Sequence, residues 1–365
     1  MSHDHFLVRD LQKELLGLVN SSRIFSDIHV EQNQPLMLKT PRGWQPVDDM
    51  PVSIENLVPF LSTIDEDWED KIIDGAIDCS YVLEQWRLRC NIYRMAGGSK
   101  VGVSIRRFPV EPLTLERTGL PGYVKTMLEA SKGIILVTGP TGAGKTTSIA
   151  SMLDYINTTR QGHIVTIEEP IEYELHRKQS MISQREVPTD TPSFSVGLRE
   201  ALRQKPDVLM VGEIRDFDTA DTVLHAGESG HLVLATLHTS SAVRAITKLL
   251  SFFPQDQRIQ RAATLAESLV GVVFQSLIPS EDGQHQIMAS EMVFNNNQQI
   301  APFITDPSKL HMIGDFMRRK EDNMSRTLNE VLLQLVVKKS ISSRDALRVA
   351  YNRLELHEMI NGAKR

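Results

Sequence analysis

Apolar positions in the N-terminal part of the chain repeat with two different spacings. Apolar residues recurring every three or four positions predict a helix over residues 10–19, and a second helix is expected over 54–63 with Ser53 at its N-cap. Elsewhere apolar and polar residues alternate, which is typical of half-buried strands. The strands expected from this alternation cover residues 26–31, 35–39, 79–83, 87–94 and 100–108. Together these elements predict a small α+β domain.

The pattern changes near Gly119, where continuous apolar runs replace the alternation. Helices are expected over residues 196–204 and 220–228, between these runs. Strands that are apolar on both faces belong to a parallel sheet covered by crossover helices. The expected strands of this kind are 134–138, 163–167, 208–211 and 232–236. The expected fold class of this part is therefore α/β.

The last part of the chain has the spacing of helices. Its clearest apolar stripe consists of Leu328, Val331, Leu332, Leu335 and Val336, which we expect to pack against a core rather than to hold a cofactor.

Closely spaced prolines after Phe108 indicate a linker between the first domain and the rest of the chain. The expected organisation is an N-terminal domain (1–108), a linker (109–118), a core with a parallel sheet (119–292) and a helical C-terminal region (293–365).

The strand expected at 134–138 runs directly into a glycine-rich loop. Residues 139–146 fit the pattern G-x-x-x-x-G-K-[ST], and a helix is expected behind them. Backbone N–H groups of such a loop and the helix dipole bind phosphate, while Lys145 would reach the β- and γ-phosphates of ATP and the Thr146 hydroxyl would bind Mg²⁺. This context disfavours the alternative of a glycine turn with a chance lysine. The expected nucleotide-binding residues are Gly139, Pro140, Thr141, Gly142, Ala143, Gly144, Lys145, Thr146 and Thr147.

Polar residues also follow three of the other expected strands, at the edge where a doubly wound sheet binds its ligands. Glu168 and Glu169 end the run that starts at 163, and acids there suit Mg²⁺ or water positioning. Each could equally be a solvated loop acid. Glu169 is a candidate Mg²⁺ partner through water, and Glu168 a candidate catalytic residue.

The run 208–211 is followed by Gly212 and Glu213, which resembles a Walker B strand ending in an acid. A glutamate beside the γ-phosphate can orient the attacking water and partly deprotonate it. The alternative is a structural ion pair between Glu213 and Arg215. After the run 232–236, His238 could donate to a phosphate oxygen, although a lone histidine is more often a structural residue.

Composition and charge narrow the function classes. A chain of 365 residues is expected to form two or three domains, and its net charge of −6 gives no general attraction to nucleic acid. Two cysteines, Cys79 and Cys90, are too few for a disulfide framework, which favours a reducing cytoplasm. The sequence has no apolar run of about 18 residues, and residues 1–5 lack the features of a signal peptide. Membrane contact is therefore expected only through a partner protein.

Taken together, these stretches resemble the secretion ATPase superfamily, in particular its PilT-like branch of type IV pilus retraction motors. In the family's order, 139–146 is similar to the Walker A motif, 167–173 to the Asp box, 211–216 to the Walker B motif and 230–239 to the His box. The resemblance implies a RecA-like ATPase core preceded by a PAS-like α+β domain and followed by the helical C-terminal region. It also implies a homo-hexamer in which each PAS-like domain packs on the neighbouring core.

The same resemblance implies roles for residues outside the loop. Arg89 and Arg106 would contact the γ-phosphate as arginine fingers, whereas the residues alone would be interpreted as exposed strand arginines. Arg107 is an alternative to Arg106, because neighbouring strand residues face opposite ways. His238 and Arg215 would sense or stabilise the γ-phosphate.

Some stretches depart from the retraction ATPases. Glu169 stands where the family commonly has aspartate, and residues 298–304 contain Pro302 and no arginine where retraction ATPases carry an arginine-bearing segment. Residues 192–206 also look like the DotB-type ATPases of type IVB secretion and conjugation.

The expected function is a cytoplasmic ATPase that powers a type IV pilus or secretion machine through an inner-membrane platform protein. A nucleic-acid translocase and a low-turnover ATP-binding scaffold are the alternatives. The sequence leaves open the choice between retraction, assembly and secretion, the direction of motion and the ring symmetry.

Overall fold

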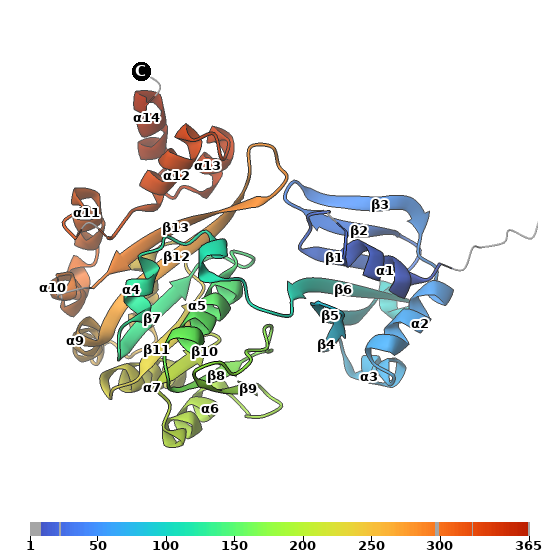
Figure 1. The fold of residues 1–365 in the computed structure, drawn as a ribbon, viewed down its shortest axis with the longest axis horizontal. Helices are drawn as coiled ribbons and strands as arrows, with labels where there is room; N and C mark the ends of the chain where they lie inside the picture. The colour runs from blue at the N-terminus through green and yellow to red at the C-terminus, as the bar shows by residue number, and fades with distance from the viewer. Residues whose placement is uncertain (1–8, 22, 296–298, 323, 364–365) are drawn as a thin grey trace, which may run out of the picture. The chain divides into compact units, whose positions relative to one another are not determined.

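The computed structural model describes residues 9–21, 23–295, 299–322 and 324–363 (Figure 1). The chain forms two compact units, and each is described here by itself. The N-terminal unit comprises the residues up to Glu111 together with Asp282–His285, and the second unit comprises Pro112–Glu281 and Gln286–Arg365. The domain boundaries expected from the sequence stay a prediction. Residues 1–5, which are expected to lack the features of a signal peptide, lie outside the described residues.

The N-terminal unit is an antiparallel sheet with three helices, as the alternating pattern predicts. The strand order is β3-β2-β1-β6-β5-β4. The strands are β1 (Asp27–Glu31), β2 (Pro35–Thr40), β3 (Gly43–Pro51), β4 (Ile77–Leu83), β5 (Trp86–Met95) and β6 (Lys100–Pro109), and the helices are α1 (Leu11–Val19), α2 (Ile54–Ile64) and α3 (Trp68–Asp74). Alternate strand residues and one face of each helix bury a common core that includes Leu15, Ile28, Leu57 and Leu88.

Three details differ from the expectations for this unit. Strand β3 was not expected, because its two prolines and paired aspartates hide the alternation. Helix α3 was also missed. Ser53 does occupy the N-cap of α2, but its hydroxyl donates to Asn56 Oδ1 (2.9 Å) and makes no cap hydrogen bond with the backbone.

The second unit is built on a seven-stranded sheet in the order β13-β12-β7-β11-β10-β8-β9. All neighbouring strands run parallel except β12 and β13, which form an antiparallel hairpin. The strands are β7 (Gly133–Thr138), β8 (His163–Glu168), β9 (Met181–Glu186), β10 (Val208–Val211), β11 (Leu232–Leu237), β12 (Leu269–Pro279) and β13 (Gln286–Phe294). The four strands predicted from the apolar runs are thus the central part of this sheet.

Both faces of this sheet are covered, which explains why its strands are apolar throughout (Figure 1). Along β7, Ile134 and Leu136 face one core, while Ile135 and Val137 face the other. The second core is closed by α4 (Val124–Leu128) and α5 (Lys145–Thr159). The first core is closed by α6 (Phe194–Ala201), α7 (Phe217–Glu228), α8 (Ala242–Ser251) and α9 (Arg258–Ser268).

The C-terminal region is helical from α10 onward, and it packs into the same first core. Its helices are α10 (Ala301–Thr305), α11 (Met312–Arg319), α12 (Leu328–Val337), α13 (Ser343–Val349) and α14 (Arg353–Ala363). Helix α12 carries the predicted apolar stripe and begins with a capping box between Thr327 and Glu330. Pro302 lies in the first turn of α10, and Gln298, part of the segment compared with the retraction ATPases, lies outside the described residues. In the part of the chain that the structure describes, no helix is long and apolar enough to cross a membrane.

Candidate functional site

The glycine-rich loop joins β7 to the N-terminus of α5, as the motif predicts. Gly139 and Gly144 adopt φ angles of +152° and +80°, a region that favours glycine. A Cβ atom on Gly139 would also lie 2.3 Å from the carbonyl oxygen of Gln275 on β12. The Gln275 side chain donates to the carbonyl of Ala143 (2.7 Å), so β12 holds the loop in its curved form.

Lys145, the first residue of α5, is buried and turned back into the loop. Its Nζ donates to the carbonyl oxygens of Gly139 and Pro140, both at 3.0 Å, and lies 3.5 Å from Nδ1 of His238. Burial lowers the pKa of this ammonium from its ordinary value, while the charge of Glu213 opposes that shift. The structure therefore places a partly desolvated cation where the loop and the His box meet.

Glu213, Arg215, Glu169 and His238 lie together at the carboxyl edge of the sheet. Strand β10 lies between β8 and β11, so the loops that follow these three strands converge there. Arg215 donates to Glu213 through Nε (2.7 Å) and to Glu169 through Nη1, and His238 Nε2 lies 3.7 Å from Glu213. The ion pair considered as an alternative is therefore present, and it is part of a larger cluster.

His238 is the neutral member of this group near pH 7. Burial lowers the pKa of its imidazole, and the positive charge of Lys145 lowers it further. A neutral imidazole can donate one hydrogen bond and accept another, which suits a group that contacts both a carboxylate and a phosphate oxygen.

Glu168 occupies a different environment from Glu169, although the two are adjacent. Its side chain is buried and accepts hydrogen bonds from Thr166 Oγ1 (2.6 Å) and Gln184 Nε2 (3.0 Å). Burial raises the pKa of this carboxyl to about 7. It lines a small cavity together with Thr146 and Tyr173, and Thr147 is hydrogen bonded to the Tyr173 hydroxyl (2.9 Å).

The arginines predicted as fingers, Arg89 and Arg106 or Arg107, all lie on β5 and β6 of the N-terminal unit. Arg89 and Arg106 face each other across these strands, and each is paired with an acid, Asp78 at 3.7 Å and Asp27 at 2.7 Å respectively. Arg107 faces the other way: its guanidinium stacks on Phe25 and Trp86 and donates to the carbonyls of Val19 (2.8 Å) and Phe25 (3.1 Å). Of the two neighbours, Arg106 is the one with its charged group on an accessible face.

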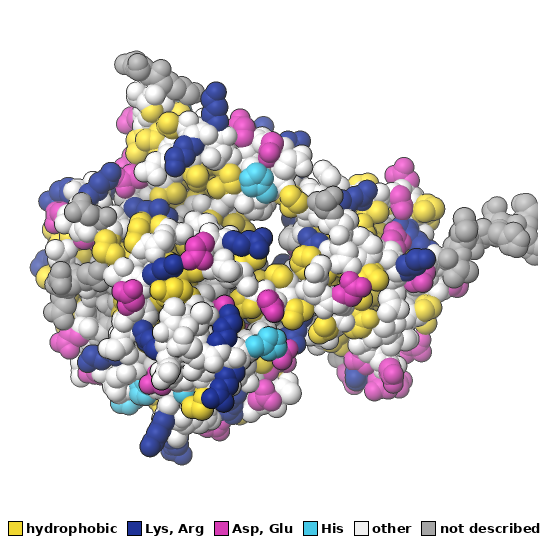
Figure 2. Space-filling view, in the orientation of Figure 1, with side chains coloured by type: hydrophobic (Ala, Val, Ile, Leu, Met, Phe, Trp, Pro, Cys, Tyr) yellow, Lys and Arg dark blue, Asp and Glu magenta, His cyan; other side chains and the backbone are white. Residues whose placement is uncertain are grey.

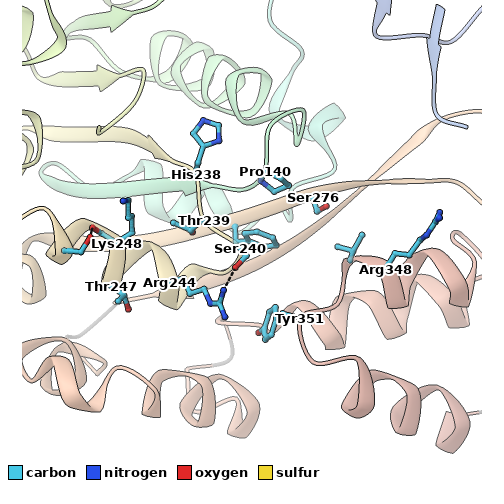
Figure 3. A pocket seen from close by; sticks show the side chains of 13 residues that line it. Pro140, His238, Thr239, Ser240, Arg244, Thr247, Lys248, Ser276, Arg348 and Tyr351 are labelled. Carbon is cyan, nitrogen blue, oxygen red and sulfur yellow. Dashed lines mark hydrogen bonds between the residues drawn. The ribbon is translucent and has the colours of Figure 1, made fainter. Parts of the chain in front are cut away.

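A hollow of about 840 Å³ adjoins the loop within the second unit (Figure 3). Pro140 and His238 lie at one part of its wall, and Tyr351 of the C-terminal region lies at another. Arg244 of α8 donates to Ser240 (3.0 Å), which lies in the short segment between His238 and α8. The hollow therefore connects the phosphate loop with the helices that follow the sheet.

Two residues that hold this site together were not anticipated. Gln275 lies on β12 and Gln184 lies on β9, and neither strand was predicted from the sequence. Strand β12 follows α9 without a break, so its apolar run cannot be told from a continued helix. Gln184 contacts Glu168 only because β9 pairs in parallel with β8, a long-range feature that no local pattern reveals.

The sheet order, the phosphate loop and the acid-histidine edge define a P-loop ATPase with a RecA-like core. Comparison with known proteins agrees: residues 83–341 match the family model described as type II/IV secretion system protein. The chain is 36% identical over 278 residues to the type IV pilus retraction ATPase PilT of Pseudomonas aeruginosa, covering 74% of this chain and 80% of that protein.

Solved structures give the same result. A crystal structure of the pilus retraction motor PilT with bound ADP has a TM-score of 0.80 and 35% identity, covering 94% of this chain and 99% of that one. The X-ray structure of the Legionella pneumophila ATPase DotB has a TM-score of 0.81 and 25% identity, covering 92% and 93%. The chain belongs to the type II/IV secretion system protein family. The predicted family, the fold class and the assignment as an ATPase are confirmed.

Proposed function

We propose that this chain is the motor ATPase of a type IV pilus or type IV secretion machine and acts as a homo-hexamer. The observation that carries the proposal is the meeting of Lys145, Glu213 and His238 at one edge of a secretion-family ATPase core. Similarity to PilT, a pilus retraction ATPase, and to the ATPase DotB supports the type IV machines as its setting. Its work would act on an inner-membrane platform protein from the cytoplasmic side.

The loop residues 139–147 would bind the phosphates of ATP. Backbone N–H groups and Lys145 would neutralise charge on the β- and γ-phosphates. Mg²⁺ fits the donors present here, because it needs few protein oxygens beside those of the phosphates, and Thr146 supplies a hydroxyl from the first turn of α5 at the loop. Glu169 would contribute through water. Bound Mg²⁺ would supply neutralisation of the negative charge on the phosphates.

Glu213 is the proposed general base and water-positioning residue. Its second carboxylate oxygen faces His238, while the first is held by Arg215, so the carboxylate has a fixed orientation. His238 and Arg215 would contact the γ-phosphate. Glu168, buried beside Thr146, would keep strands β8 and β9 in register, because it accepts from Thr166 of β8 and from Gln184 of β9.

Arg89 and Arg106 are the proposed arginine fingers of the N-terminal unit. Arg89 is paired with Asp78 and Arg106 with Asp27, and partly exposed ion pairs of this kind can exchange for a phosphate at small cost. A finger of this kind raises turnover by about a thousandfold or more. Arg107 is fixed by two aromatic rings and two carbonyls, which favours Arg106 for the role.

The direct test is specific ATPase activity measured over a range of protein concentrations that spans assembly, with mass measured in parallel. We expect activity per chain to rise as the hexamer forms, and to be lost in Lys145→Ala and Glu213→Gln at every concentration. If activity per chain were constant in a monomer, neighbouring subunits would not be needed to complete the ATPase site, and this would contradict the proposal. No turnover in the assembled protein would favour an ATP-binding scaffold.

Measuring ATP turnover with added DNA tests the remaining alternative, a nucleic-acid translocase. Basic and acidic side chains are interspersed over the face of the molecule shown in Figure 2, which gives no support to a nucleic-acid track there. We expect DNA of any strandedness to leave turnover unchanged at low salt. Stimulation by DNA that disappears as salt is raised would indicate a translocase instead.

A further inference from the structure

Glu291 of β13 is a buried carboxylate outside the phosphate site, and its hydrogen bonds join the sheet to three other elements. The residue is 1% exposed. One oxygen accepts from the backbone N–H of Ala242 (2.7 Å), and the other accepts from the N–H of Leu328 (3.3 Å) and from the Tyr351 hydroxyl (2.6 Å). The carboxylate therefore contacts the first residue of α8, the first residue of α12 and the segment after α13.

The donors explain why a carboxylate stands here. Ala242 and Leu328 are the first residues of their helices, where backbone N–H groups lack partners within the helix and the helix dipole favours negative charge. All the partners found for Glu291 in the described chain are neutral donors. A group that only accepts hydrogen bonds satisfies them at once, whereas an amide would present a donor to one of them.

One of these contacts leads directly to the nucleotide site. Ala242 follows the His box by three residues, and the intervening segment is short and well tied. Thr239 is hydrogen bonded to Thr138 at the end of β7 (2.8 Å) and donates to the carbonyl of Ser241 (3.0 Å), the N-cap of α8. His238 at one end contacts Lys145 and lies near Glu213, while Ala242 at the other is held by Glu291.

The other contacts lead to the C-terminal helices. Leu328 opens α12, and Tyr351 lies between α13 and α14. Tyr351 also lines the hollow that reaches Pro140 and His238 (Figure 3). A displacement of the segment after His238 would thus change the position of a carboxylate that α12 and Tyr351 share.

We propose that Glu291 is a positioning residue that couples the His238 segment to the C-terminal helices, so that nucleotide state at the phosphate loop is transmitted to α12–α14. The proposal rests on the proposed function, because it assigns a regulatory link to the same ATPase site. Glu291 acts through Ala242 and does not contact the nucleotide.

The first test is a double-mutant cycle on ATP turnover by the full chain. Glu291→Gln keeps the shape and one acceptor oxygen, and we expect kcat to fall about tenfold with KM for ATP nearly unchanged. In a His238→Ala background the same substitution should cost almost nothing further, because the group that Glu291 positions is gone. Equal losses in both backgrounds would overturn the proposal while leaving the proposed function intact.

The second test reads the C-terminal helices directly by hydrogen–deuterium exchange, with ADP or AMP-PNP as the bound nucleotide. We expect amides of α12–α14 to exchange differently in the two states of the native chain. The difference should vanish in Tyr351→Phe, which removes one hydroxyl and is suitable even if Glu291→Gln folds poorly. Identical exchange with both nucleotides in the native chain, or an unchanged difference in Tyr351→Phe, would contradict the link.

Asn329→Ala is the matched control. Asn329 is also buried in α12 and donates to the Asn352 carbonyl (3.0 Å) and the Glu355 carboxylate (2.7 Å), but its contacts stay within the C-terminal region. It should loosen α12 and α14 while the kcat of the ATPase stays near its native value. A tenfold loss of kcat in this variant would show that general loosening explains the effect of Glu291→Gln, and would overturn the proposal.

Discussion

The ATPase unit contains two carboxylate clusters with opposite character. Glu213 is 21% exposed, and its partners Arg215 and His238 are 51% and 44% exposed. Glu291 is almost fully buried, and its hydrogen-bond partners among the described residues are neutral donors. Exposed ion pairs contribute little to stability and exchange partners easily, whereas a buried acceptor that loses its donors is costly.

This difference in burial and in bonding partners suits the two clusters to different tasks. The Glu213 cluster can release its internal pairs to a nucleotide at small cost, which suits a site that binds and hydrolyses ATP repeatedly. The Glu291 cluster cannot rearrange without leaving helix N–H groups unsatisfied, which suits a rigid junction. Substitutions should therefore have their largest effect on turnover at the first cluster and their largest effect on stability at the second.

The largest effect is expected for Lys145→Ala. Loss of the loop ammonium should reduce ATP turnover on the order of a thousandfold, because charge on the phosphates is no longer neutralised. The free energy of unfolding should change by no more than about 1 kcal/mol, since burial already opposes the charge of this lysine. Lys132→Ala, at an exposed position in the same unit, is the control and should leave turnover unchanged.

Glu291→Ala should have the largest effect on stability. Two helix N–H groups and one hydroxyl lose their acceptor in a buried place, so we expect a loss of about 3 kcal/mol in the free energy of unfolding. Chemical denaturation of the full chain measures it, with the exposed Glu267→Ala as comparison. A loss below about 1 kcal/mol would contradict the rigid junction.

Glu168 lies between the two extremes, because it is buried but borders the phosphate site. Burial raises the pKa of Glu168 from 4.5 to about 7 in the folded protein. Between these two pH values the unfolded chain has released the proton, whereas the folded chain still holds it. Its contribution to stability is present below pH 4.5 and is lost as pH rises through about 7.

We therefore expect the stability of the native chain relative to Glu168→Gln to fall by about 3 kcal/mol as pH rises through that interval. Denaturation series at several pH values would measure this difference. A pH-independent difference would show that Glu168 titrates near the value of a solvent-exposed glutamate.

The smallest effect on stability is expected for Arg215→Ala. Because Arg215 is half exposed, losing its pairs with Glu213 and Glu169 should cost about 0.5 kcal/mol or less. Turnover should nevertheless fall at least about tenfold if Arg215 contacts the γ-phosphate. A large stability loss with normal turnover would assign Arg215 a structural role instead.

Local pattern predicted the first cluster well and the second not at all. Strands that end in polar residues indicated Glu213 and His238, because a parallel sheet brings its carboxyl ends to one edge. Glu291 lies in β13, a strand that was not predicted, and its donors come from residues 242, 328 and 351. Such contacts between distant segments leave no periodic signal in the sequence.

The choice between Arg106 and Arg107 shows the same limit. Alternation along β6 indicates that the two side chains face opposite ways, but not which face is covered. Phe25 and Trp86 decide this by stacking on Arg107, and both belong to other parts of the N-terminal unit.

The central claim, that Glu213 orients the water that attacks ATP, is tested most directly by Glu213→Gln in the assembled chain. Turnover and ATP affinity should be measured on the same preparation. We expect turnover to fall on the order of a hundredfold or more while affinity stays within about threefold, because the amide keeps the shape but cannot accept the proton. Retained turnover, or a loss explained wholly by weaker ATP binding, would contradict the account.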